Sequence, residues 1–210
     1  MLIPYRMPRL IEKFYPELIF RLPGNEKTVY LTFDDGPSEK VTTFVLNQLE
    51  KYHAVATFFL IGDKLNQHEG LVKRLISQGH RIGNHTYHHL NAWRTDPDTY
   101  WKNVQKTQAK LGKFSPAESP LFRPPYGKIR KKNIKRLHQN GFRIIMWSLL
   151  SFDFDPAYDP EKSLKKLKQS VRPGDIVVFH DSPKAFPSLQ KILPPFLDFL
   201  FAEGYETRTL

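Results

Sequence analysis

Hydrophobic and polar positions alternate with two different periods from residue 28 to the end of the chain, which predicts alternating strands and helices. Short apolar or alternating runs rich in β-branched and aromatic residues predict seven strands. These strands cover residues 28–33, 54–60, 80–83, 121–122, 142–147, 175–179 and 205–210. Apolar residues three and four positions apart predict the helices between them. These helices cover residues 41–52, 71–76, 98–111, 131–140, 160–171 and 189–200. Strands separated by helices favour parallel pairing with right-handed crossovers, as in an α/β fold.

The alternating region is predicted to form a single domain, residues 27–210, because no linker-like stretch divides it and no internal repeat appears. Residues 1–26 predict an N-terminal helical extension that packs on the outside of this domain. The spacing of the elements leaves two architectures open, an open doubly wound sheet or an irregular barrel with fewer than eight strands.

The composition supports a folded protein and limits its chemistry. The 210 residues are 40% hydrophobic and 25% charged, which supplies a real core and excludes a disordered tail or a collagen-like fibre. The absence of cysteine excludes disulfides, thiolate metal ligands and a cysteine nucleophile. Any metal site must therefore be built from histidine, aspartate and glutamate.

The net charge of +11 would attract anionic partners such as acidic wall polymers, lipid headgroups or nucleic acid. The excess is spread along the chain, however, and its densest stretch, residues 128–136, is typical of a solvated helix face. We therefore expect no nucleic-acid partner, and nothing indicates an oligomeric state. No run approaches the roughly 18 apolar residues of a membrane span, and the N-terminus lacks the features of a signal peptide. These features predict a cytoplasmic location, although a truncated chain would look the same.

Five clusters of polar residues each follow directly on a predicted strand. They are Asp34-Asp35-Gly36-Pro37, His85-Thr86-Tyr87-His88-His89, Arg123-Pro124-Pro125-Tyr126-Gly127, Asp153 with Asp155, and His180-Asp181. The carboxyl ends of parallel strands share one face of an α/β fold, and that face carries the active site. The clusters are therefore predicted to meet in one cleft.

The first two clusters suggest a metal site. Asp34 and Asp35 are compatible with an ordinary turn, but burying two adjacent carboxylates at a strand end would be costly without a cation. His85 and His89 could share a helix face by chance, and His88 offers a competing ligand. Two imidazoles and one carboxylate give three ligands with an open fourth position, which is typical of a catalytic zinc site.

Other polar and aromatic residues allow a structural or a functional interpretation. His180 is either a hydrogen-bonded core histidine or a proton-transfer group beside the other clusters. Arg123 is either a surface charge or a side chain fixed by the two prolines that follow it. Tyr126, Trp147 and Phe154 are either core residues or walls of a substrate groove.

Four motifs give the chain a resemblance to the polysaccharide deacetylase family, which includes chitooligosaccharide (nodulation-type), chitin, peptidoglycan and acetylxylan deacetylases. They are TFDDGP at residues 32–37, HTYHH at 85–89, RPPYG at 123–127 and VVFHD at 177–181. The resemblance covers about residues 27 to 210. It implies a distorted (β/α) barrel with about seven parallel strands, and therefore favours the irregular barrel over the open doubly wound sheet.

The resemblance also implies roles at the reacting centre. Asp35, His85 and His89 resemble the ligands of one divalent metal ion. Asp34 resembles the catalytic base, and His180 the general acid. Two imidazoles and a carboxylate suit Zn²⁺, while Co²⁺, Ni²⁺ and Mn²⁺ are compatible with the same ligands.

The surrounding residues take supporting roles by the same resemblance. Arg123 would pair with and orient the base, and Asp153 would hydrogen-bond to His180. The backbone N–H of Tyr126 would hold the oxyanion. The remaining substrate-binding candidates are Pro125, Trp147 and Phe154.

Residues 150, 154 and 178 depart from the family pattern in this chain. Leu150 stands where the family often has aspartate, Phe154 where it has tryptophan, and Val178 where leucine is usual. These differences change the expected acetyl-binding wall and bear on the substrate more than on the reaction.

The reaction implied is metal-dependent removal of N-acetyl groups from N-acetylglucosamine-containing glycans, with release of acetate. The partner would be an acetylated amino-sugar oligomer or polymer, and the positive charge favours an anionic glycan such as peptidoglycan. Two alternatives remain open: an esterase that attacks O-acetylated sugars with the same site, and a basic glycan-binding or nucleic-acid-binding module without turnover.

Overall fold

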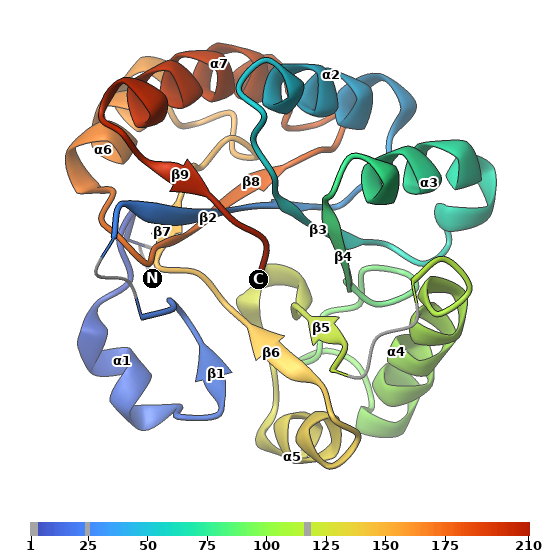
Figure 1. Cartoon of the computed structure of the whole chain (residues 1–210). Helices are drawn as coiled ribbons and strands as arrows, with labels where there is room; N and C mark the ends of the chain where they lie inside the picture. The colour runs from blue at the N-terminus through green and yellow to red at the C-terminus, as the bar shows by residue number, and fades with distance from the viewer. Residues whose placement is uncertain (1–3, 24–25, 116–118) are drawn as a thin grey trace.

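A curled, mainly parallel sheet forms the centre of the protein, and helices cover its outer face (Figure 1). The structure is a computed structural model that describes residues 4–23, 26–115 and 119–210. The strands in this part of the chain are β1 (Leu18–Ile19), β2 (Thr28–Asp34), β3 (Thr57–Leu60), β4 (Arg81–Asn84), β5 (Leu121–Phe122), β6 (Arg143–Ile145), β7 (Leu149–Leu150), β8 (Ile176–His180) and β9 (Glu206–Thr207). They follow the order β1-β6-β5-β4-β3-β2-β8-β7, and β9 pairs with β2.

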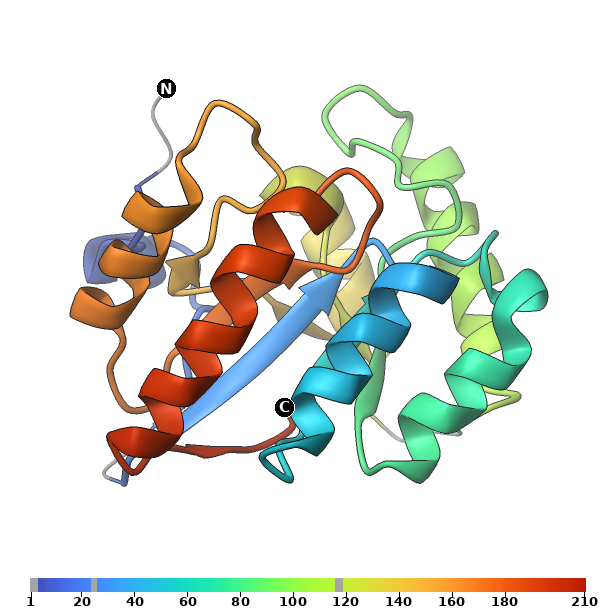
Figure 2. The ribbon, with the colours of Figure 1, turned by 90° about the horizontal axis from the view of Figure 1, so that it is seen from above.

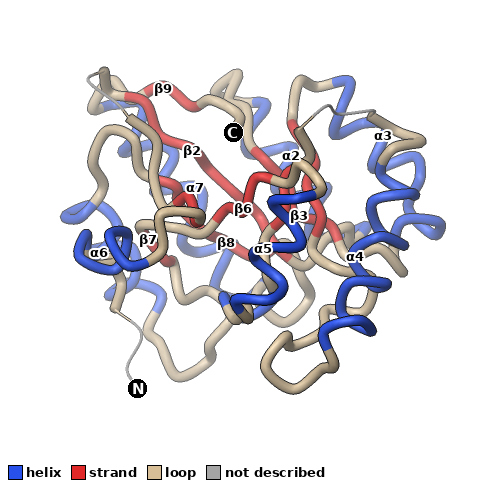
Figure 3. Tube along the Cα trace, turned by 90° about the horizontal axis from the view of Figure 1, so that it is seen from below, coloured by secondary structure: helices blue, strands red, loops and turns tan. Residues whose placement is uncertain are grey.

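Helices connect most of these strands and pack around the sheet, as the view from below shows (Figure 3). They are α1 (Arg9–Phe14), α2 (Glu39–Glu50), α3 (Glu69–Ser77), α4 (Pro97–Leu111), α5 (Lys131–Gln139), α6 (Pro160–Ser170) and α7 (Phe186–Ala202), with 3₁₀ turns η1 (Leu65–His68) and η2 (Pro125–Gly127). The start of α4 shows how the sequence fixes a boundary, because Asp96 Oδ1 accepts hydrogen bonds from the N–H groups of Asp98 and Thr99. Among the described residues, no helix is both long and apolar enough to span a bilayer.

The predicted single-domain, barrel-like α/β fold is confirmed. All seven predicted strands are present and the paired strands run parallel, as β2 does with both β3 and β8. Two short strands, β1 and β7, were not predicted. Each has only two residues, which is too short to show a hydrophobic period.

The N-terminal segment is only partly the helical extension that the sequence predicts. Helix α1 has six residues, and the segment then supplies β1, which pairs with β6. An antiparallel bridge between Arg6 and Leu149 joins the segment to β7 as well. The segment thus connects the two edge regions of the curled sheet. Leu18 becomes a strand residue because its side chain is buried against the sheet core, 8% exposed.

Alternation along the central strands sorts their side chains between two cores. In β2, Val29, Leu31 and Phe33 join the core between the sheet and the outer helices. Thr32 and Asp34, offset by one residue, point to the opposite, inner face. In β8 the inner face holds Val178, whose neighbour two positions along is His180 at the strand end. The inner face therefore carries polar chemistry to the carboxyl ends of two adjacent strands.

Candidate active site

The predicted polar clusters meet at the carboxyl ends of the strands, around a cleft of about 700 Å³. The segments that follow β4, β7 and β8 all extend beyond the carboxyl end of β2 (Figure 2). Most of the predicted site residues line this cleft. They are Asp34, Asp35, His85, His89, Tyr126, Trp147, Phe154 and His180. The predicted convergence of distant sequence segments is therefore present in the structure.

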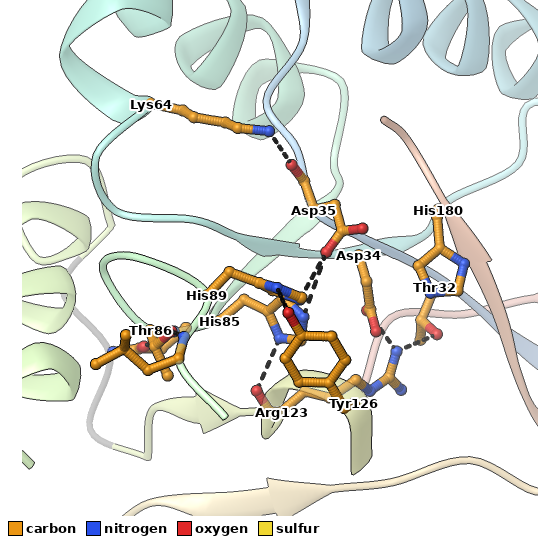
Figure 4. Close-up of polar contacts among 12 residues, drawn as sticks. Thr32, Asp34, Asp35, Lys64, His85, Thr86, His89, Arg123, Tyr126 and His180 are labelled. Atoms are coloured by element: carbon orange, nitrogen blue, oxygen red, sulfur yellow. Dashed lines mark hydrogen bonds and ion pairs between the residues drawn. The ribbon is translucent and has the colours of Figure 1, made fainter. Parts of the chain in front are cut away.

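Asp35, His85 and His89 form a compact cluster of ligand atoms, all within 4.8 Å of one another (Figure 4). Asp35 Oδ1 lies 3.1 Å from Nε2 of His89 and 3.6 Å from Nε2 of His85. His88, the competing candidate, is not part of the cluster, and its Nδ1 lies 3.4 Å from Asp63 Oδ2. Within the described residues, this is the group of carboxylate and imidazole side chains with the spacing of a metal site.

The backbone that presents the cluster is irregular, and the two histidines lie on a loop rather than on a helix. Asp35, Thr86 and His89 have φ values of 77°, 64° and 53°, in the left-handed region that non-glycine residues seldom adopt. The loop is held by Asn84 Oδ1, which accepts from Thr86 N, and by Thr86 Oγ1, which accepts from Leu90 N. Strained backbone of this kind persists where surrounding contacts fix it and is concentrated at functional sites.

The electrostatics of the cluster fit a divalent cation. Although His89 lies nearby, Asp35 Oδ1 is a buried atom without a hydrogen-bond donor among the described residues. Burial opposes ionisation of Asp35, but the surrounding imidazoles of His89, His180 and His85 hold the pKa of this carboxyl well below its usual range. Burial lowers the pKa of His85 to about 4, so its ring is neutral at pH 7. His85 Nδ1–H donates to the Arg123 carbonyl at 2.8 Å. The neutral ring therefore carries no proton on Nε2, whose lone pair is available to a metal ion beside Asp35.

Asp34 is held by a fully buried arginine. Arg123 Nη1 donates to Asp34 Oδ1 and to Thr32 Oγ1, both at 2.7 Å, while Nη2 donates to the Met146 carbonyl at 2.8 Å. The guanidinium also stacks on the Phe59 ring, 4.2 Å from its centroid. These contacts satisfy the buried cation and leave Asp34 Oδ2 without a hydrogen bond among the described residues.

His180 faces the cleft with a carboxylate behind it. Its Nδ1–H donates to Asp153 Oδ1 at 2.8 Å, and its backbone N–H donates to Asp153 Oδ2 at 2.8 Å. Ser151 Oγ donates to the same carboxylate at 2.7 Å. Burial disfavours the charged imidazole, but the Asp153 carboxylate outweighs burial, and the pKa of His180 is raised to about 9. A cationic His180 with a free Nε2 can deliver a proton into the cleft.

Asp181 supports the turn that carries Asp34 and Asp35. Its backbone N–H donates to the Asp34 carbonyl at 2.9 Å, and its Oδ2 accepts from Thr42 Oγ1 at 2.5 Å. Gly36 lies so close that a Cβ there would overlap the Asp181 carboxylate. Burial raises the pKa of Asp181 to about 7. The glycine of the Asp-Asp-Gly-Pro turn is thus required by this close approach.

Apolar side chains form one wall of the cleft beside the proton-transfer groups. Trp147, Leu150, Phe154 and Val178 all line it, and the Phe154 ring meets the His180 ring edge-on at 4.7 Å. The altered family positions are therefore cleft residues. The rim of the cleft also carries Tyr126, which is 57% exposed and has φ 61°.

Three predicted residues do not line the cleft. Arg123 and Asp153 lie behind Asp34 and His180, and contact them as described above. Pro125 is buried, and Pro124 lines the cleft in its place.

The sequence interpretation also missed contacts at the site. Thr32 binds Arg123, and its position two residues before Asp34 was a signal that both face the same way. Lys64 lines the cleft, and its Nζ donates to the Asp35 carbonyl at 2.7 Å (Figure 4). No pattern in the sequence marks that contact, because the acceptor is a main-chain oxygen.

A curled parallel sheet with an Asp/His/His cluster, a paired carboxylate and a paired imidazole at its carboxyl ends defines a candidate metal-dependent hydrolase site. The chain belongs to the polysaccharide deacetylase family, whose model matches residues 21–145. The resemblance inferred from the motifs is therefore confirmed.

Relatives and solved structures support the same family. A peptidoglycan-N-acetylglucosamine deacetylase of Bacillus cereus is 33% identical over 180 residues, which cover 83% of this chain and 65% of that protein. This chain thus spans slightly less than two thirds of the length of that relative. The crystal structure of Bc1960, a peptidoglycan N-acetylglucosamine deacetylase, matches with a TM-score of 0.82 at 30% identity, covering 96% of this chain and 94% of that one.

The fold is also shared with a protein described as a pseudoenzyme. The crystal structure of wild-type BA3943, a CE4 family pseudoenzyme from Bacillus anthracis, matches with a TM-score of 0.81 at 25% identity, covering 92% of this chain and 67% of that one. Similarity of fold therefore does not decide whether a family member turns over substrate, because activity depends on the side chains present in the cleft.

Proposed function

We propose that this protein hydrolyses N-acetyl groups of N-acetylglucosamine-containing glycans and releases acetate. The observation that carries the proposal is the meeting of three groups in one cleft: the Asp35/His85/His89 cluster, the Asp34 carboxylate and the His180 imidazole. An amide is a poor electrophile, so its hydrolysis needs an activated water, a stabilised oxyanion and a protonated leaving group. The cleft offers side chains suited to each requirement.

Asp35, His85 and His89 would hold one divalent ion, for which we propose Zn²⁺ because two imidazoles and a carboxylate suit it. An ion held there would supply Lewis-acid chemistry, polarising the acyl carbonyl and lowering the pKa of water from about 15.7 to about 7. Co²⁺, Ni²⁺ and Mn²⁺ are the alternatives that the ligand types allow.

Asp34 acts as the base. Its Oδ1 is paired with Arg123 at 2.7 Å, so Oδ2 is the oxygen available to receive a proton from the attacking water. The buried guanidinium keeps the carboxylate oriented. The water oxygen then bonds to the acyl carbon, and charge develops on the carbonyl oxygen.

The backbone N–H of Tyr126 stabilises that charge. Tyr126 lies on the cleft rim in the left-handed conformation, which sets the direction of its amide. A preorganised N–H donor of this kind strengthens its interaction as the oxyanion forms. We assign Tyr126 to this position as a main-chain donor, independent of its phenol group.

His180 acts as the acid. With Nδ1 committed to Asp153, Nε2–H is the proton donor to the nitrogen of the departing amine. The carbon–nitrogen bond breaks as that nitrogen gains the proton, which gives acetate and a glucosamine unit. General-acid catalysis of this kind contributes on the order of 10²–10⁴-fold.

The rim of the cleft favours an anionic glycan. Lys64, Lys128 and Lys184 line it together, whereas the inner wall is apolar. Positive charge around a cleft concentrates negatively charged substrates and makes association sensitive to salt. Peptidoglycan fragments, which carry carboxylates, are therefore the substrate class that we propose over neutral chitooligosaccharides.

Acetate release after metal loading tests the proposed reaction. The protein is assayed with N-acetylglucosamine oligomers, peptidoglycan fragments and an O-acetylated xylan, with added Zn²⁺ or Co²⁺ and again after chelation. We expect metal-dependent release of acetate from the N-acetylated substrates. Release should be faster from peptidoglycan fragments than from N-acetylglucosamine oligomers, and salt should reduce this difference in rate. Faster release from the O-acetylated substrate would instead identify an esterase. Tight, salt-dependent glycan binding without release, retained in Asp34→Asn, would identify a binding module.

A further inference from the structure

Trp93 is an exposed aromatic residue in the segment between β4 and α4, which extends beyond the carboxyl ends of the strands (Figure 2). Its exposed fraction is 58%, whereas the other two tryptophans of the chain, Trp101 and Trp147, are 9% and 8% exposed. Exposed large aromatic surfaces often mark binding sites. Trp93 therefore differs from its two counterparts in offering its ring to solvent on the side of the molecule that holds the cleft.

The Trp93 side chain is held in place by its polar atom. Its Nε1–H donates to the Ile129 carbonyl at 3.2 Å, and its backbone N–H donates to Asn91 Oδ1 at 3.0 Å. Arg130 fixes the same loop by donating to the carbonyls of Trp93, at 2.6 Å, and Ala92, at 2.7 Å. The indole nitrogen is thus satisfied within the protein, and the surface left for a ligand is the preorganised part of the ring that the Lys128 ammonium above it does not cover.

A continuous set of residues links Trp93 to the candidate metal cluster. Lys128 Nζ lies 5.2 Å from the centroid of the Trp93 ring, and Lys128 itself lines the cleft. Tyr126 lines the cleft two residues earlier, and its hydroxyl lies 3.1 Å from His89 Nδ1. Trp93 itself does not line the cleft, so a chain-like ligand that left the reacting centre over Tyr126 and Lys128 would reach the indole beyond it.

Building on the proposed function, we propose that Trp93 is a stacking platform for a sugar residue of the glycan chain that lies beyond the sugar that is hydrolysed and its immediate neighbour. A pyranose ring presents a flat face of C–H groups, which is complementary to the electron-rich face of an indole. The polymeric nature of the substrate supplies this further sugar, which a dimer lacks. The rigid attachment of the indole keeps the entropy cost of ordering it small.

The dependence of turnover on chain length tests this platform. The kcat/KM values for the dimer and the tetramer of N-acetylglucosamine are compared in wild type, Trp93→Ala and Trp93→Phe. We expect the tetramer-to-dimer ratio to fall about tenfold in Trp93→Ala, a loss typical of one removed stacking contact, and to be largely restored in Trp93→Phe. Phe14→Ala is the matched control, because Phe14 is 71% exposed on α1, an element that contributes no residue to the cleft.

A binding measurement separates this inference from the proposed reaction. Acrylamide quenching of tryptophan fluorescence reports mainly on Trp93, since the other two indoles are buried. We expect the tetramer to protect wild type and Asp34→Asn from quenching, and its calorimetric Kd to rise about tenfold in Trp93→Ala.

The two arms give distinct outcomes. An unchanged tetramer-to-dimer ratio in Trp93→Ala, or tetramer binding that leaves the fluorescence unprotected, would overturn the platform. Protection without any acetate release would uphold the platform and reject the proposed reaction. Circular dichroism melting of each variant establishes that a change in the ratio does not come from unfolding.

Discussion

Two ion pairs flank the candidate metal cluster, and they differ in how much water reaches them. The pair of Arg123 with Asp34 is closed, with side chains 0% and 6% exposed. In the pair of His180 with Asp153, the carboxylate is 0% exposed but the imidazole retains 15% exposure towards the cleft. The first pair holds a fixed charge because arginine stays protonated. The second holds a charge that can be lost and regained, as proton donation requires.

The difference follows from what each pair contacts. Arg123 also donates to Thr32 and to the carbonyls of Ile145 and Met146, so the guanidinium is part of the inner core. His180 has one ring nitrogen bonded and the other directed away from Asp153. A buried ion pair with every donor satisfied resists perturbation, whereas a half-satisfied imidazole keeps a nitrogen for chemistry.

Removal of Arg123 should have the largest effect. In Arg123→Met, Asp34 becomes a buried carboxylate without a partner, which costs about 3–5 kcal/mol of unfolding free energy. Arg123→Lys keeps the charge but not the fork that reaches Thr32 and Met146, and should lose less. Urea denaturation of both variants measures the difference. A loss below about 1 kcal/mol in Arg123→Met would show that the closed pair does not stabilise the fold.

Substitutions of Asp34 and of His89 should separate metal binding from turnover. Asp34→Asn removes the proton acceptor but leaves the three proposed ligands, so we expect a full metal content and activity lower by about 10²–10⁴-fold. His89→Ala removes a ligand, so metal and activity should fall together. Metal analysis after dialysis, alongside acetate release, checks both. Full metal content and normal turnover in His89→Ala would refute the ligand assignment.

Asp153→Asn should shift the pH profile rather than abolish activity. The pKa of His180 is raised to about 9, so the protonated acid is lost, and kcat falls, as pH rises through that value. Without the Asp153 carboxylate the pKa of His180 drops, by roughly 1–3 pH units, and the alkaline limb moves to lower pH. An alkaline limb at the same pH in Asp153→Asn would exclude His180 as the acid that this carboxylate tunes.

The same pair should contribute to stability with a defined sign. A histidine whose pKa is higher in the folded state stabilises that state fully below its unfolded pKa, about 6.5, and loses this contribution as pH rises through about 9. The stability difference between wild type and Asp153→Asn should therefore shrink between those two pH values. Urea denaturation at pH 6 and pH 10 measures it.

The sequence was most informative where chemistry follows a strand. Asp34 ends β2 and His180 ends β8, and the parallel architecture alone places such residues on one face. The partners of these residues were harder to predict from spacing. The resemblance, rather than periodicity, indicated that Arg123 pairs with Asp34, because a residue whose acceptors lie on β2 and after β6 carries no local signal.

Other features could not be predicted because their physical cause lies outside local sequence. The strand pairing of Leu18–Ile19 depends on the partner β6, more than 120 positions away along the chain. The contact of Lys64 with the carbonyl of Asp35 depends on the left-handed backbone at that residue. Pro124 lines the cleft and Pro125 does not, because the η2 turn begins at Pro125 and directs it into the interior.

Gly127 gives the smallest expected effect and tests how closely the rim is packed against the apolar wall. A Cβ at Gly127 would lie 2.5 Å from Cη2 of Trp147, and φ there is +62°, so Gly127→Ala must displace the indole or the loop that carries Tyr126. Because this loop positions the proposed oxyanion donor, we expect kcat to fall several-fold while metal content is retained. Both ion pairs lie outside the displaced contact, so the alkaline limb of the pH profile should stay in place. A change in that limb would mean that the rim and the His180 pair are coupled, and that the proton-donating half of the site is less independent than its contacts suggest.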